Sequence, residues 1–237
     1  MKKLQALKSR IGELKEATVC LSGGVDSSAV AKAAYDVLKD RARAVTIKTE
    51  FIPEEDVLNA VRIAKEIGIK HKIVCVNLLD EEIEINPENR CYLCKLRIIS
   101  SVPGKIILDG TNADDDPKRP GLAAIEELGV ISPLKETGIT KQEVRQIASD
   151  MGLTNWSKPQ NSCLATRIPF GTRITMERLK IIEKAESTLH KLGITDCRAR
   201  LHSDSITLVI PKSYKESFEK QKNFVDKEIP VNDIKWI

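Results

Sequence analysis

One short segment of the chain combines residue types that bind phosphate groups. Apolar residues 17–21 are followed by Ser22-Gly-Gly-Val-Asp-Ser-Ser28, and apolar residues at helical spacing come next. Glycines leave backbone N–H groups free to face an anion, and a helix N-terminus adds partial positive charge. An aspartate beside phosphates is unfavourable unless a cation lies between them, so Asp26 predicts bound Mg²⁺. An ordinary strand-to-helix turn is the alternative. We expect a nucleotide phosphate site formed by Ser22, Gly23, Gly24, Asp26, Ser27 and Ser28.

A second polar loop, Asp109-Gly-Thr-Asn112, follows the apolar residues 106–108. Open α/β sheets bind ligands at the carboxyl ends of their strands, which is where this loop would lie. Gly110 permits close approach of the backbone, and Thr111 and Asn112 can contact phosphate or ribose oxygens. A strand-end loop that is rich in Asx turns would explain the same residues. We expect Gly110, Thr111 and Asn112 to complete the nucleotide site.

Three of the six cysteines lie in segments that suit metal binding or nucleophilic catalysis. Cys91 and Cys94 are three residues apart, so their thiols share one face if the segment is helical. Cys163 lies in a polar segment with cationic neighbours, which lower the pKa of a thiol and favour the nucleophilic thiolate. A lone CxxC is compatible with zinc, a redox dithiol or an iron–sulfur cluster. Structural zinc needs four ligands, whereas three thiolates suit a [4Fe-4S] cluster with one open iron. We expect the remaining cysteines to be core residues: Cys20, Cys75 and Cys197.

Paired arginines near the C-terminus suit an anionic substrate. Arg198 and Arg200 alternate with Ala199 and Leu201, so on a strand both guanidinium groups face the same side. Two such groups match a phosphate or a carboxylate, although a solvated strand face is the alternative. Residues 158–212 contain ten Lys or Arg and five Asp or Glu. We expect four arginines to form a cradle for an anionic nucleotide substrate: Arg167, Arg173, Arg198 and Arg200.

The order of the predicted elements determines the fold class. Apolar runs predict strands at 17–21, 45–49, 71–78 and 106–108, and the segments between them have helical periodicity. Thr140 and Glu143 form a capping box that begins a helix ending at Gly152. This alternation predicts an α/β fold, a mainly parallel sheet with helices on both faces. After Gly152 the pattern changes to a helix, a hairpin over 198–210 and a last strand. We therefore expect one domain over 1–160 that contains the nucleotide site, and a small α+β domain over 161–237 that contains Cys163 and the arginine cradle for the substrate.

Composition and charge exclude several classes of protein. Lys and Arg number 38 and Asp and Glu 34, a net charge of only +4, too little for a dedicated duplex-DNA or membrane-surface binder. No apolar run resembles an export signal or a membrane span. We expect a cytoplasmic protein with reduced thiols, no membrane partner and no nucleic-acid partner.

Several motifs resemble a known family. Ser22 to Ser28 is similar to the signature of the PP-loop ATP pyrophosphatases, and further segments resemble the LarE-type sulfur transferases of that superfamily. The family more often has Ser at the position of Thr166 and His-Gly at His202-Ser203. The resemblance extends from about residue 13 to residue 211, and the segments that carry it are Asn89-Arg-Cys-Tyr-Leu-Cys-Lys95, Asp109-Gly-Thr-Asn-Ala-Asp114, Arg119-Pro-Gly121, Ser132-Pro-Leu134, Cys163-Leu-Ala-Thr-Arg-Ile-Pro-Phe-Gly-Thr172 and Arg198-Ala-Arg200.

The resemblance implies an AMP-forming sulfur transferase. Such an enzyme binds ATP and Mg²⁺, adenylates a carboxylate of a pyridinium dicarboxylate mononucleotide, releases pyrophosphate and replaces AMP by sulfur. The product becomes the nickel-pincer cofactor of lactate racemase. The implied catalytic residues are Asp26 and Cys163. Sulfur would come either from Cys163 itself or from sulfide on a cluster held by Cys91, Cys94 and Cys163, and the CxxC motif favours the cluster. We also expect a homo-oligomer that acts on this small nucleotide.

Three other functions fit parts of the sequence. A tRNA-thiolating PP-loop enzyme would need a broad basic surface or an RNA-binding module, which a net charge of +4 does not favour. An ammonia-using synthetase of the superfamily would not need Cys163. A nucleotide-binding protein without turnover is the non-catalytic alternative.

Overall fold

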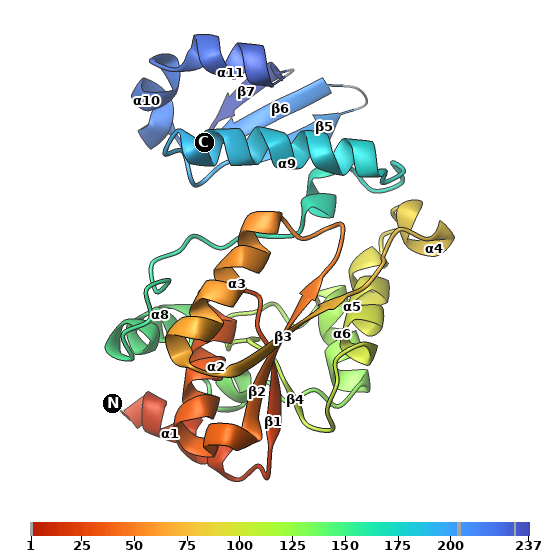
Figure 1. Cartoon of the computed structure of the whole chain (residues 1–237). Coiled ribbons are helices and arrows are strands. Elements are labelled where there is room, and N and C mark those ends of the chain that lie inside the picture. Colours follow the sequence, from red (N-terminus) through yellow and green to blue (C-terminus); the bar gives the residue numbers. More distant parts are fainter. Residues whose placement is uncertain (1, 203–204, 230) are drawn as a thin grey trace. The chain divides into compact units, whose positions relative to one another are not determined.

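The computed structural model, drawn in Figure 1, describes residues 2–202, 205–229 and 231–237. It divides into two compact units. Unit 1 comprises Met1–Asn77 and Asn89–Gln160, and unit 2 comprises Leu78–Glu88 and Asn161–Ile237. The assignment of separate functions to 1–160 and 161–237 stays a prediction. The sequence did not predict that the short segment Leu78–Glu88 groups with the C-terminal unit.

Unit 1 contains a four-stranded parallel sheet in the order β3-β2-β1-β4, which confirms the predicted α/β class. Apolar residues of β1 and β2 alternate between two clusters. Val19 and Ala44 belong to the main core, whereas Val45 and Ile47 form part of a second cluster. The sheet is therefore covered on both faces. The strands are β1 (Ala17–Cys20), β2 (Ala42–Lys48), β3 (Lys70–Cys75) and β4 (Ile107–Leu108).

Helices cover both sides of this sheet (Figure 1). The main core joins β1 and β2 to α1 (Lys2–Gly12), α2 (Val25–Leu38), α3 (Glu54–Ile67) and α8 (Lys141–Asp150). On the other face lies α5 (Arg90–Ser100), with α6 (Pro120–Glu127) packed against it. The remaining short elements of unit 1 are the 3-10 turn η1 (Lys39–Arg41) and α7 (Pro133–Glu136).

Local signals in the sequence set the helix ends. Thr140 accepts a hydrogen bond from the backbone N–H of Glu143, whose carboxylate accepts from the N–H of Thr140, so the predicted capping box is confirmed. Helix α3 begins after Pro53 and ends at Gly68, whose φ of 80° is in the left-handed region that glycine favours.

Strand β3 differs from the expectation. It is an edge strand, and Cys75 at its end is exposed, so the prediction that Cys75 is a core residue is wrong. Cys197 is buried, as predicted, and burial raises its pKa to about 12. Cys20 is partly buried beside the second cluster, and burial raises its pKa to about 12 as well.

Unit 2 is a small α+β structure around the sheet β5-β6-β7, as predicted. Strands β5 and β6 pair antiparallel, and residues 203–204 between them lie outside the described residues. Phe218 and Trp236 contact edge to face with ring centroids 5.5 Å apart. The elements are α4 (Glu81–Glu84), η2 (Leu164–Arg167), α9 (Met176–Lys191), β5 (Arg198–His202), β6 (Ser205–Ile210), η3 (Lys212–Tyr214), α10 (Lys215–Glu219), α11 (Lys222–Glu228) and β7 (Val231–Trp236). In the described part of the chain, no helix has both the length and the apolarity needed to cross a membrane.

Candidate functional site

The glycine loop of unit 1 connects β1 to α2. Gly23 has a φ of +77°, and a Cβ there would lie 2.8 Å from the carbonyl oxygen of Asp56, so only glycine fits. Helix α2 begins after Gly24, and among the described residues no side chain caps its N-terminus. Backbone N–H groups of its first turn are therefore available to an anion.

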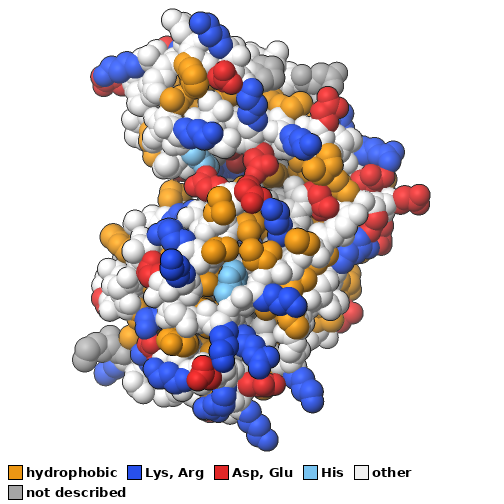
Figure 2. All heavy atoms as spheres, viewed as in Figure 1, with side chains coloured by type: hydrophobic (Ala, Val, Ile, Leu, Met, Phe, Trp, Pro, Cys, Tyr) orange, Lys and Arg blue, Asp and Glu red, His pale blue; other side chains and the backbone are white. Residues whose placement is uncertain are grey.

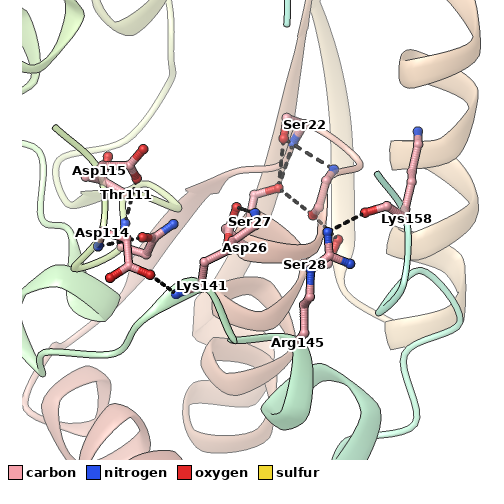
Figure 3. A network of polar contacts seen from close by, with 12 residues as sticks. Ser22, Asp26, Ser27, Ser28, Thr111, Asp114, Asp115, Lys141, Arg145 and Lys158 are labelled. Carbon is pink, nitrogen blue, oxygen red and sulfur yellow. Dashed lines mark hydrogen bonds and ion pairs between the residues drawn. The ribbon is translucent and has the colours of Figure 1, made fainter. Parts of the chain in front are cut away.

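Hydroxyl groups and one amide hold this loop (Figure 3). Ser27 Oγ accepts from the backbone N–H of Ser22 at 3.1 Å, and Ser28 Oγ donates to the carbonyl of Gly24 at 2.8 Å. Asn155 donates to the carbonyl of Gly23 at 3.0 Å and to Ser28 Oγ at 2.9 Å. The sequence analysis missed Asn155, because 127 residues separate it from Ser28 and an isolated Asn gives no local signal.

Asp26 lies in the first turn of α2 and pairs with Lys141 Nζ through Oδ2 (Figure 3). Its other oxygen, Oδ1, is buried and has no hydrogen-bond partner among the described residues. Burial raises the pKa of Asp26 above its ordinary value, although the hydrogen bond and charge of Lys141 act in the opposite direction. A buried carboxylate oxygen without a partner, next to a phosphate-type loop, fits a bound Mg²⁺ ion.

Lys141 is a second residue that the sequence analysis did not assign to the site. It is the first residue of α8, and its backbone N–H donates to Asp114 Oδ2 at 2.8 Å. One turn later Arg145 donates to the backbone carbonyls of Trp156 and Lys158, each at 3.1 Å. The capping box fixes where α8 begins and so places Lys141 at the helix start, from which its side chain pairs with Asp26 of the glycine loop.

The second loop lies beside the first. A Cβ at Gly110 would lie 2.7 Å from the backbone nitrogen of Ser27, so the two loops touch, as the sheet order requires. Asp109 accepts from Ser132 Oγ at 2.7 Å and from the Thr111 hydroxyl. Asn112 Oδ1 accepts from the N–H of Asp114 at 2.9 Å. This contact forms an Asx turn, which the sequence analysis gave as the alternative explanation of the loop. Nucleotide contacts of Gly110, Thr111 and Asn112 stay predictions.

The predicted iron–sulfur ligands are distributed over both units. Cys91 and Cys94 are half-buried on α5 in unit 1, whereas Cys163 belongs to unit 2. Within the described ranges, no three His, Cys, Asp or Glu side chains gather closely enough to hold a metal ion. A [4Fe-4S] cluster held by Cys91, Cys94 and Cys163 stays a prediction, and we derive no step from one.

Cys163 immediately precedes η2 in unit 2 and is half-buried. Its carbonyl oxygen accepts from the backbone N–H of Thr166 at 3.0 Å and from the Thr166 hydroxyl at 2.7 Å. The family more often has Ser at the Thr166 position, and the hydroxyl that both residues share makes this contact. The Cys163 loop therefore has a defined backbone conformation.

The four arginines of the expected cradle differ in their surroundings. Arg167 is 3% exposed and pairs with the buried Glu186. Arg173 is exposed and pairs with Glu84. Burial alternates along β5, so Arg198 and Arg200 share its solvent side as the spacing predicted. Contact of all four residues with a substrate stays a prediction, and the partners of Arg167 are internal to unit 2.

Comparisons with known proteins cover most of the chain. The asparagine synthase family profile matches residues 4–84. The uncharacterized protein slr1717 of Synechocystis is 39% identical over 91% of this chain and 84% of its own. The pyridinium-3,5-bisthiocarboxylic acid mononucleotide synthase of Lactiplantibacillus plantarum is 33% identical over 89% of this chain and 80% of its own. One of the subunits of the glutamine-hydrolysing GMP synthase of Pyrococcus furiosus is 25% identical over 83% of this chain and 71% of its own.

Proposed function

Because the chain belongs to the LarE-type branch of the PP-loop enzymes, we propose that it adenylates a carboxylate of a pyridinium dicarboxylate mononucleotide and replaces AMP by sulfur. Members of this superfamily use ATP, and this chain is an ATP-dependent enzyme. The observation that carries the proposal is the buried, unpartnered oxygen of Asp26 in a loop of phosphate-binding type. The name of the Lactiplantibacillus relative supplies the class of substrate.

Adenylation is assigned to unit 1. The N–H groups of the glycine loop and the start of α2 bind the phosphates, and Asp26 holds Mg²⁺, which offsets phosphate charge when bound. A substrate carboxylate oxygen attacks the α-phosphorus, the bond to the bridging oxygen breaks, and pyrophosphate leaves. Lys141 favours the ionised form of Asp26 that metal binding requires. No protein acid or base is needed for this step.

Sulfur transfer is assigned to Cys163. Its thiolate attacks the acyl carbon of the adenylate, and AMP leaves with the electron pair of the broken C–O bond. Loss of the Cα proton of Cys163 and cleavage of its Cβ–S bond then yield a thiocarboxylate and dehydroalanine at position 163. This route balances without an oxidant or reductant and delivers one sulfur atom per chain. Cys91 and Cys94 have no role in it.

The face drawn in Figure 2 does not favour the tRNA-thiolating alternative. On the face drawn in Figure 2, Lys and Arg side chains are interspersed with acidic and apolar ones and do not form a continuous basic surface. The likeness to GMP synthase subunits reflects the shared superfamily. An ammonia-using synthetase of that superfamily would have no need for Cys163.

The proposal is tested with the purified chain, ATP, Mg²⁺ and the pyridinium dicarboxylate mononucleotide. Pyrophosphate and a product in which sulfur replaces one carboxylate oxygen, identified by mass, are expected in equal amounts. Cys163→Ser is the matched control, because it keeps the loop and the adenylation site but removes the sulfur. Pyrophosphate release without any sulfur-containing product from the unaltered chain would contradict the proposal.

A further inference from the structure

A buried ion pair in unit 2 joins the Cys163 loop to helix α9. Arg167 and Glu186 are each 3% exposed. Arg167 Nε donates to Glu186 Oε1 at 2.8 Å, and Nη2 donates to Oε2 at 3.1 Å. This two-pronged contact fixes the plane of the guanidinium group, because both bonds must be satisfied together.

The rest of the guanidinium group holds the Cys163 loop. Nη1 donates to the hydroxyl oxygens of Ser162 and Thr166, the latter at 2.7 Å, and Nη2 donates to Asn161 Oδ1 at 3.0 Å. These side chains come from both sides of Cys163 in sequence. Every N–H group of Arg167 therefore has an acceptor within unit 2, which does not favour the expected contact between Arg167 and the substrate.

Glu186 also contacts strand β5. Its Oε1 accepts the backbone N–H of Ala199 at 2.9 Å. Ala199 is the β5 residue between Arg198 and Arg200, the arginines that share the solvent side of that strand. One carboxylate thus connects the loop that carries the thiol to the strand that carries the predicted anion-binding pair.

We propose that the Arg167–Glu186 pair is a positioning device that fixes the Cys163 thiol relative to Arg198 and Arg200. The inference rests on the proposed function, because it assigns sulfur to Cys163 and the substrate anion to β5. Burial of two charges is costly, and apolar residues of similar volume often stabilise a protein as well or better. Stability alone therefore does not account for the pair, whereas the need to orient a reacting group does.

Two conservative variants and one double variant test the device. R167K keeps the charge but cannot donate to Glu186 and to three loop acceptors at once, and E186Q keeps the acceptor for Ala199. In R167M/E186Q neither charge of this pair remains, and the introduced glutamine still accepts from the N–H of Ala199, so folding is preserved. The matched control is K184M, which removes a lysine of the same helix, α9, and breaks its exposed ion pair with Glu228 of α11.

Three readouts distinguish positioning from folding: pyrophosphate release, the rate of sulfur transfer in one turnover, and alkylation of Cys163 by iodoacetamide. Alkylation is measured by peptide mass, with the exposed Cys75 of unit 1 as internal standard. We expect sulfur transfer to fall at least about tenfold, the effect of one lost charge-assisted hydrogen bond. Pyrophosphate release and the KM for the nucleotide substrate should stay unchanged. The ratio of Cys163 to Cys75 alkylation should change, and K184M should match the unaltered chain in every readout.

A folded R167M/E186Q chain that transfers sulfur at the unaltered rate, with unchanged Cys163 alkylation, would overturn the inference. If the unaltered chain forms no sulfur product, the proposed function fails instead. In that case the alkylation ratio still decides whether the pair positions Cys163: a change supports positioning, and an unchanged ratio overturns it.

Discussion

Asp26 and Asp36 lie on the same helix, α2, and each pairs with lysine, yet we predict opposite effects on stability when either is replaced by asparagine. Burial raises the pKa of Asp26 and outweighs its pairing with Lys141. Burial acts the same way on Asp36, but hydrogen bonds and charges from Lys32 and Lys8 outweigh it and lower the pKa of Asp36. The ionised form of Asp26 therefore destabilises the ligand-free fold, whereas the ionised form of Asp36 stabilises it.

The dependence on pH follows from these directions. An aspartate in the unfolded chain has a pKa of about 3.9. Because the pKa of Asp26 rises on folding, its contribution to stability is lost as pH rises from that value through its folded pKa. Asp36 behaves in the opposite way, since its stabilisation is present above about pH 3.9 and is lost as pH falls through its folded pKa.

We expect Asp26→Asn to raise the free energy of unfolding of the ligand-free chain by about 1 kcal/mol at neutral pH, because it removes a buried charge. This corresponds to an increase of about 2–4 °C in Tm for a unit of this size. Asp36→Asn should lower the free energy of unfolding by about 0.5–1 kcal/mol, because its ion pairs are partly exposed and solvent screens them.

Thermal unfolding with and without MgATP measures both effects. MgATP should raise the Tm of the unaltered chain and of the Asp36→Asn variant by mass action. It should not stabilise the Asp26→Asn variant, which should also release no pyrophosphate. A lower Tm for ligand-free Asp26→Asn would show that pairing outweighs burial at this site. Normal pyrophosphate release by this variant would refute the assignment of Mg²⁺ to Asp26.

Three further predictions address the glycine loop, the substrate anion and the sulfur source. Gly23→Ala should lower the free energy of unfolding by more than about 1 kcal/mol and abolish ATP binding, because its Cβ would meet the Asp56 carbonyl. Gly24→Ala is the control for thermal unfolding, since its φ is −80° and its Cβ meets nothing closer than 3.4 Å. Arg200→Ala should weaken binding of the mononucleotide substrate about tenfold and leave ATP binding unchanged in calorimetry; equal losses would contradict separate sites. After one anaerobic turnover with excess sulfide, mass spectrometry should find dehydroalanine at Cys163 even when both cysteines of α5 are changed to Ala, whereas repeated turnover with an intact thiol would support a cluster-bound source.

The parts of the fold that depend on neighbouring residues could be predicted from the sequence. The capping box at Thr140 and the glycine at the end of α3 are local signals, and the structure confirms both. The exposure of Cys75 could not be predicted, because the apolar run of β3 is compatible with either a central or an edge strand. Strand order depends on contacts between distant segments, and the order β3-β2-β1-β4 leaves β3 with a partner on one side only.

The same reasoning explains why the sequence analysis did not identify the protein partner of Arg167. Its neighbours in sequence are polar, and an arginine in a polar loop suggests a contact with an anionic ligand. The carboxylate that it contacts lies 19 residues later on α9. Glu186 did give a signal, since it shares the buried helical stripe with Leu179, Ile182 and Leu189. A charged residue at a core position requires a buried partner of opposite charge. The position of Glu186 on this stripe therefore indicates a buried cation beside α9, and the preceding loop supplies it as Arg167.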